Sequence, residues 1–170
     1  DFVSELTTQQ EFFDTIVEID ETYIGGKPRK HVHNDDDEPK IKRGRGTNKT
    51  PVIGIVDRVN KKVFAKISLP NSAGQKLTAN QLIDILKTVS KQENRNTVIS
   101  DEYNAYHSLS KHNFVHLKID HSRAFSDGNG THTNNIESFW ATLKRGIFGI
   151  YHHISIDYMQ RYVDEFCFRY

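Results

Sequence analysis

The order of the apolar segments along the chain is the feature that most constrains its fold. Three strand-like segments come first, and the short turn "VNKK" joins the second to the third in the manner of a hairpin. After them, helical and strand-like patterns alternate. The expected strands cover about 16–24, 51–58, 62–69, 96–101 and 114–120, and the expected helices about 78–89, 102–109, 134–147 and 157–168. This order predicts an α/β fold, a mixed five-stranded sheet with helices on both faces.

The composition is that of one globular domain with a real core. The chain has 170 residues, of which 36% are hydrophobic, and it has ten Phe and seven Tyr. No apolar run is long enough for a transmembrane helix, so no membrane association is expected. Cys167 is the only cysteine, which excludes an internal disulfide and a cysteine zinc cluster and suits a reducing compartment.

Charge is concentrated in the segment 27–49, although the net charge of the chain is only +1. This segment holds eight basic and four acidic side chains. Its densest part, here called the basic cluster, consists of Lys40, Lys42, Arg43 and Arg45. A charge run of this kind is usually a solvated loop. The alternative is an arm that contacts DNA phosphates.

Three acidic residues stand at comparable places in the predicted elements. Asp20 lies on the first strand, Asp101 follows the strand 96–100, and Glu137 lies in the first turn of the helix that begins near Asn134. Carboxylates that converge repel each other unless cations lie between them, and Mg²⁺ prefers carboxylate oxygens. Each acid also has a structural alternative: Asp20 as an exposed strand-end charge, Asp101 as a helix cap, and Glu137 as a capping-box residue with Asn134.

The spacing of these acids resembles a known pattern. Thirty-five residues separate Asp101 from Glu137, the interval of the D,D-35-E pattern of transposases and retroviral integrases. The segments "VEIDETYIGGK", "GIVDR", "SDEYNAYHSL", "HSRAFSD", "THTNNIESFWATLKRG" and "YHHIS" occur in that order. Together they resemble the catalytic domain of bacterial insertion-sequence DDE transposases related to the Merlin elements, the ISXO2-like group. The resemblance runs from about Val17 to Phe168 and implies a ribonuclease-H-like fold. We therefore expect a catalytic domain over 16–170, preceded by an N-terminal extension over 1–15.

The resemblance also implies roles for individual residues. It makes Asp20, Asp101 and Glu137 the catalytic acids and the ligands of Mg²⁺, for which Mn²⁺ substitutes. Lys144 matches a family position seven residues after Glu137, where it meets a DNA phosphate near the cut. Arg145 is expected to make a supporting phosphate contact, and His132 to position a nucleophilic water or a phosphate.

The other two acids of the first strand are assigned by side-chain alternation. Glu18 shares a strand face with Asp20, whereas Val17 and Ile19 lie on the other face. Glu18 is therefore the second candidate for the metal ligand on this strand. Glu21 points to the opposite face, where we expect it to make a structural ion pair. Trp140 belongs to the apolar stripe of its helix and is expected to lie in the core instead of stacking on a base.

The function implied by the resemblance is that of a DNA transposase: metal-dependent cleavage of a phosphodiester, followed by strand transfer. The expected partners are transposon ends and target DNA, bound by a homodimer or a higher oligomer, and the expected location is the bacterial cytoplasm at the nucleoid. Two alternatives are a stand-alone ribonuclease-H-like DNA nuclease and a domesticated, non-catalytic DNA-binding module. Relatives usually carry an N-terminal DNA-binding region, and the few residues before the first strand hold no cysteine pair or recognition helix. The expectation is a trimmed catalytic domain or one that has lost this region.

Overall fold

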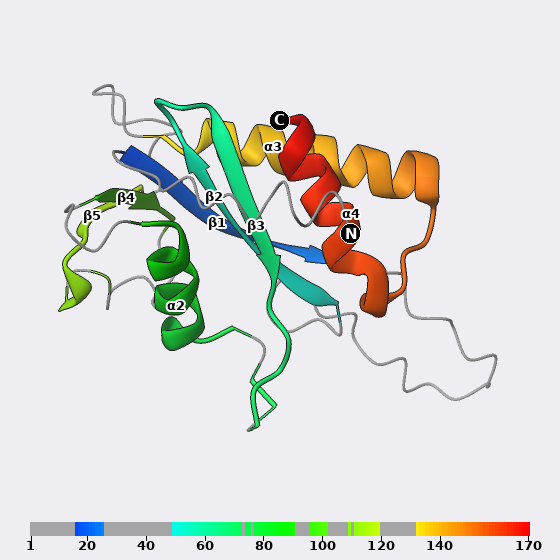
Figure 1. Cartoon of the computed structure of the whole chain (residues 1–170), viewed down its shortest axis with the longest axis horizontal. Helices are drawn as coiled ribbons and strands as arrows, with labels where there is room; N and C mark the ends of the chain where they lie inside the picture. The colour runs from blue at the N-terminus through cyan, green and yellow to red at the C-terminus, as the bar shows by residue number, and fades with distance from the viewer. Residues whose placement is uncertain are drawn as a thin grey trace, which may run out of the picture.

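A five-stranded mixed sheet forms the centre of the molecule (Figure 1). The computed structural model describes residues 16–25, 49–72, 74–75, 77–90, 96–101, 109, 111–119 and 132–170. The strands are β1 (Ile16–Ile24), β2 (Thr50–Asp57), β3 (Lys62–Ile67), β4 (Thr97–Ser100) and β5 (Val115–Lys118). Their order in the sheet is β3-β2-β1-β4-β5. The strands β1, β2 and β3 pair antiparallel, whereas β4 is parallel to both β1 and β5.

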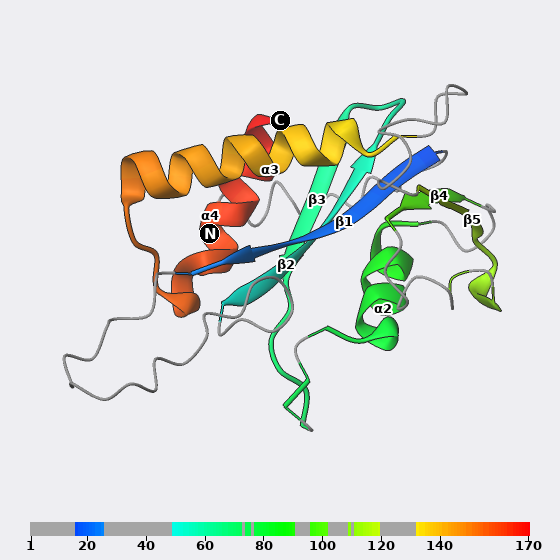
Figure 2. The same cartoon turned by 180° about the vertical axis from the view of Figure 1, so that it is seen from behind.

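Helices cover both faces of this sheet, as predicted (Figures 1 and 2). Helix α2 (Ala79–Val89) packs on one face. Helix α3 (Asn134–Gly146), the π-helical turn η3 (Ile147–Tyr151) and helix α4 (Ile156–Arg169) follow one another on the other face. Among the described residues, no helix combines the length and the apolar composition needed to cross a bilayer.

Side-chain alternation divides the core into two layers. Val17 and Ile19 share one face of β1, as predicted, and on this face they pack with α2 and with Ile53 and Ile55 of β2. The neighbouring positions of β2 face α3 and α4, where a second apolar layer forms around Phe139. Both faces of β2 are therefore buried under helices, and this is why β2 is a nearly continuous apolar run, whereas β1 carries acids among its apolar residues.

The ends of the elements follow local signals in the sequence. Thr78 caps α2 in a capping box with Gln81, because the Gln81 N–H donates to Thr78 Oγ1 and the Thr78 N–H donates to Gln81 Oε1. The hairpin between β2 and β3 and the start of α3 at Asn134 also lie where the sequence predicts them. The expected helix over 102–109 (apart from Leu109), the basic cluster and the extension over 1–15 lie outside the described residues.

Candidate active site

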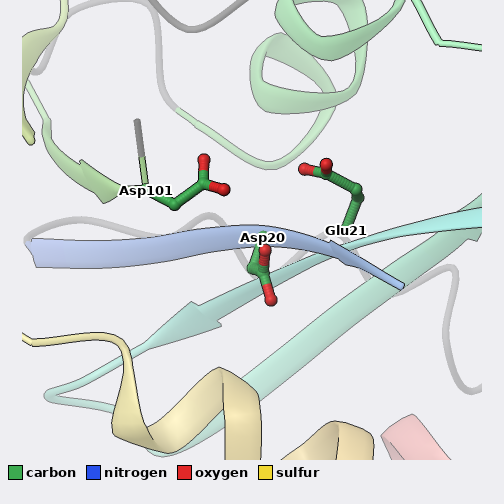
Figure 3. A group of neighbouring side chains, drawn as sticks. All are labelled: Asp20, Glu21 and Asp101. Atoms are coloured by element: carbon green, nitrogen blue, oxygen red, sulfur yellow. The ribbon is translucent and has the colours of Figure 1, made fainter. Parts of the chain in front are cut away.

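Asp20 and Asp101 meet because Asp20 lies on β1 and Asp101 directly follows β4, its parallel neighbour. The register between β1 and β4 pairs Glu18 with Ile99, and two further residues along each strand bring Asp101 level with Asp20. Glu21 joins them: one carboxylate oxygen of each of these three residues lies within 4.8 Å of the others. Figure 3 shows Asp20 on the α3 side of β1, with Glu21 and Asp101 on the other side. We call Asp20, Glu21 and Asp101 the acid group.

Burial and neighbouring negative charge disfavour the ionised form of Asp20 within the acid group. The pKa of Asp20 rises from 3.8 to about 7, first because the carboxyl is largely removed from water and then because the charges of Glu21 and Asp101 disfavour its ionised form. A backbone N–H of Glu21 and the indole N–H of Trp140 oppose this rise. A cation bound beside these three carboxyls would offset the cost of ionising Asp20.

Trp140 of α3 holds the Asp20 carboxyl from the face of the sheet that α3 covers. Its Nε1–H donates to Asp20 Oδ2 at 3.0 Å. The ring lies directly on Gly54 of β2, since a Cβ at that position would come within 2.5 Å of Trp140 Cη2. Trp140 is in the core, as predicted, and it also orients an acid. A glycine inside a strand often marks such a close approach, so Gly54 in the strand segment "GIV" is the sequence signal that a large side chain lies on β2 here.

Glu137 lies apart from the acid group in this structure. It is exposed in the first turn of α3, and its Oε1 accepts a hydrogen bond from Thr133 Oγ1 at 2.9 Å. The N-cap of α3 is Thr133, so the structural alternative for Glu137, a capping box with Asn134, is wrong. Of the three acids predicted to converge, the structure thus brings together two.

The expected role of Glu18 as the second candidate ligand is wrong. Its side chain is fully buried and binds Arg58 and the first turn of α3. Glu21 lies on the opposite face of β1, as predicted, but its carboxylate belongs to the acid group. The reason is that β4 pairs with β1 only as far as Glu18, so beyond this point side chains from both faces of β1 reach the same edge.

The predicted DNA-contacting residues occupy the two ends of α3. His132 precedes the helix and is partly exposed, with its Nδ1 3.4 Å from Glu18 Oε1. Lys144 and Arg145 lie in the last turn, partly exposed and exposed respectively. The Arg145 guanidinium donates to Thr142 Oγ1 at 3.1 Å. These positions leave all three side chains in reach of solvent, and their roles stay predictions.

The donor set of the acid group fits a hard divalent cation. Three carboxylates offer the oxygen ligands that Mg²⁺ and Mn²⁺ take, and none of the three is a soft sulfur or imidazole ligand. The raised pKa of Asp20 is a second sign of fit, because a cation would replace the proton that this carboxyl otherwise retains. Asp20 and Asp101 would hold the ion, with Glu21 beside them.

The sheet order, the strand directions and the acids that meet between the middle of β1 and the end of β4 define a ribonuclease-H-like domain. The chain belongs to the ISXO2-like transposase domain family, whose sequence profile matches residues 13–170. No curated protein matches it significantly. The predicted fold and family are thereby confirmed.

Solved structures with a similar fold include integrases and transposases. A chain of the simian T-cell lymphotropic virus intasome is 14% identical with a TM-score of 0.49, covering 86% of this chain and 45% of its own. The HTLV-2 integrase catalytic core, solved with magnesium, is 12% identical with a TM-score of 0.48, covering 92% and 84%. A pre-cleavage Mos1 transpososome chain is 13% identical with a TM-score of 0.48, covering 98% and 52%. The chain thus spans about half the length of the intasome and Mos1 chains.

Proposed function

We propose that this domain cleaves and joins DNA strands at transposon ends, using Mg²⁺ held by Asp20 and Asp101. The observation that carries the proposal is the meeting of these two carboxylates, one in the middle of β1 and one directly after the parallel strand β4, in a chain of the ISXO2-like transposase domain family. Cleavage is the attack of water on a phosphodiester that frees a 3′-OH. Joining is the attack of that 3′-OH on a phosphodiester of target DNA. Both steps are in-line displacements at phosphorus, so one site serves both.

When bound, a divalent cation supplies stabilisation of the charge that develops on the phosphate oxygens. The protein's own contribution is positional. Trp140 fixes the rotamer of Asp20 through its indole N–H. The parallel register of β1 and β4 sets the position of Asp101 along the strand direction relative to Asp20. Either Glu21, which already lies in the acid group, or Glu137, after a shift of the start of α3, would be the third acid.

The remaining assignments extend this proposal to the DNA. Lys144 contacts a phosphate near the cut, with Arg145 in support, and His132 lies where the scissile phosphate approaches the start of α3. The basic cluster contacts the DNA backbone outside the active site. Two ends must be brought together before joining, so we propose that the protein works as a homodimer or a higher oligomer on DNA.

The test is a strand-transfer assay with labelled candidate ends, target plasmid and Mg²⁺. A transposase gives both nicked ends and covalently joined products. Nicks without joined products would indicate a nuclease, and binding without either product would indicate a non-catalytic module. Asp101→Asn is the variant to run beside the wild type, because it removes one ligand charge while keeping the side-chain shape. Asp84→Asn, an exposed change on α2, is the matched control.

A further inference from the structure

Glu18 is a buried carboxylate on β1 that lies outside the acid group. Its side chain has no exposed surface, and charged side chains are almost never fully buried unless they are paired. Four N–H groups satisfy it. Oε1 accepts from Arg58 Nε at 2.7 Å and from Asn135 Nδ2 at 2.8 Å, and Oε2 accepts from the backbone N–H groups of Asn135 and Ile136 at 3.0 Å each.

Two of these donors are free N–H groups of the first turn of α3. Thr133, the N-cap residue, makes no capping hydrogen bond from its side chain to the backbone. Glu18 takes over this function from a strand more than a hundred residues earlier in the chain. A carboxylate at a helix N-terminus also interacts favourably with the helix dipole. The Glu18 carboxylate thus connects the start of α3 to β1 through hydrogen bonds.

Arg58 completes the attachment from the other side. Besides its bond to Glu18, its guanidinium donates to the carbonyl of His132, directly before the N-cap. Its backbone N–H donates to the carbonyl of Ile16 at 3.1 Å. We call Glu18, Arg58 and Asn135 the α3 clamp. It connects the beginning of β1, the end of β2 and the segment that enters α3.

The α3 clamp lies two residues from Asp20 on the same face of β1. On that face, α3 touches β1 twice through polar groups: at Glu18 by its first turn, and at Asp20 by Trp140. Glu137 follows directly on Ile136, whose N–H binds Glu18. The clamp therefore fixes where both Glu137 and Trp140 stand relative to Asp20.

We propose that Glu18 is a positioning residue for DNA cleavage and joining, which sets the start of α3 relative to Asp20. This rests on the function proposed above. Replacing a buried ion pair by apolar side chains often leaves stability unchanged or improves it, so stability alone gives a poor reason for four directed hydrogen bonds. A site that must hold its acids to within about half an ångström gives a better one.

Glu18→Gln tests the proposal, because it keeps the size of the side chain and replaces an acceptor oxygen by an NH₂ group that faces other donors. The control is Gln160→Ala. Gln160 also anchors a helix to the sheet: it accepts from the Ile67 N–H at 2.8 Å and donates to the Ala65 carbonyl at 3.0 Å. It belongs to α4, which carries none of the site residues.

Two quantities are measured on the full chain. The first is the hydrogen-exchange rate of the indole N–H of Trp140, the only tryptophan, followed by NMR without metal or DNA. The second is the single-turnover cleavage rate at saturating DNA and Mg²⁺. In Glu18→Gln we expect indole exchange to be at least about 10-fold faster and cleavage about 10- to 100-fold slower, with DNA affinity unchanged, because small misplacements in an active site cost rates of this size. Gln160→Ala should change both rates less than about 3-fold at a comparable loss of Tm.

Three results would overturn the inference: wild-type cleavage by folded Glu18→Gln, slow cleavage with unchanged indole exchange, or equal effects of the two variants at equal Tm. If Glu18→Gln does not fold, Arg58→Lys replaces it. Lysine keeps the charge beside Glu18 but has a single nitrogen to serve both Glu18 and the His132 carbonyl, so the same two changes are expected, and their absence counts equally against the inference. A wild type that neither cleaves nor joins would instead refute the proposed function itself.

Discussion

Replacing Asp20 by asparagine should stabilise the metal-free protein at neutral and alkaline pH. The change keeps the shape of the side chain, and the Trp140 indole can still donate to its carbonyl oxygen. It removes the negative charge that burial, Glu21 and Asp101 all disfavour, as the raised pKa of Asp20 indicates. Losing a proposed catalytic group thus increases the free energy of unfolding.

The size of the effect follows from the pKa of Asp20. It is 3.8 without the folded environment and about 7 in the folded protein, and each unit corresponds to about 1.36 kcal/mol, so the ionised carboxylate costs up to about 4 kcal/mol. Between these two values the folded state holds a proton that the unfolded state has lost. Below pH 3.8 both states are protonated and the cost is absent. As the pH rises from 3.8 to about 7, the free energy of unfolding of the wild type falls by this cost, whereas that of Asp20→Asn does not.

The assay is urea unfolding in EDTA at several pH values between 4 and 8.5, with the wild type and Asp20→Asn side by side. The difference in unfolding free energy should be near zero at pH 4 and should grow to a few kcal/mol in favour of the variant at pH 8. Asp84→Asn, an exposed change on α2, should stay within about 0.5 kcal/mol of the wild type throughout. A difference independent of pH, or an Asp20→Asn protein less stable than the wild type at pH 8, would refute the reasoning.

Three further changes test other parts of the structure. Gly54→Ala places a methyl group where the Trp140 ring lies; it should cost about 1–3 kcal/mol and shift the emission of this single tryptophan, and unchanged emission and Tm would contradict the packing. Lys144→Ala should leave stability within about 0.5 kcal/mol and remove most strand transfer, so a wild-type joining rate would show an ordinary surface lysine. Neutralising the basic cluster should weaken binding to all DNA sequences alike and flatten its salt dependence; an unchanged salt slope would make the segment a solvated loop.

The sequence predicts the sheet and its helices because both follow from local periodicity. Alternation in β1 correctly separates Val17 and Ile19 from Glu18 and Asp20. The meeting of Asp20 with Asp101 is also predictable, since Asp101 directly follows β4, and β4 runs parallel beside the middle of β1, where Asp20 lies. These inferences need no knowledge of side-chain partners.

The roles of the other acids depend on partners that are distant in the sequence. Nothing near Glu18 shows that Arg58 and the first turn of α3 will satisfy it, so its charge suggested chemistry where the structure shows a buried anchor. Side-chain alternation places Glu21 on the face opposite Asp20 and so predicts that the two carboxylates lie apart. This prediction fails because β4 no longer pairs with β1 at Glu21, and side chains from both faces reach the edge of β1 there. The position of Glu137 depends on how the first turn of α3 packs on the sheet, which is set by tertiary contacts and not by the local sequence.

The most direct test of a metal site at Asp20 and Asp101 is a Mn²⁺ titration of the protein at pH 8, with free Mn²⁺ followed by EPR. The wild type should bind Mn²⁺ saturably, and Mg²⁺ should compete for the same site. Asp20→Asn and Asp101→Asn should each weaken this binding at least about 10-fold, while Asp84→Asn should bind as the wild type does. Equal binding by the wild type and the two ligand variants would contradict a metal site formed by these carboxylates.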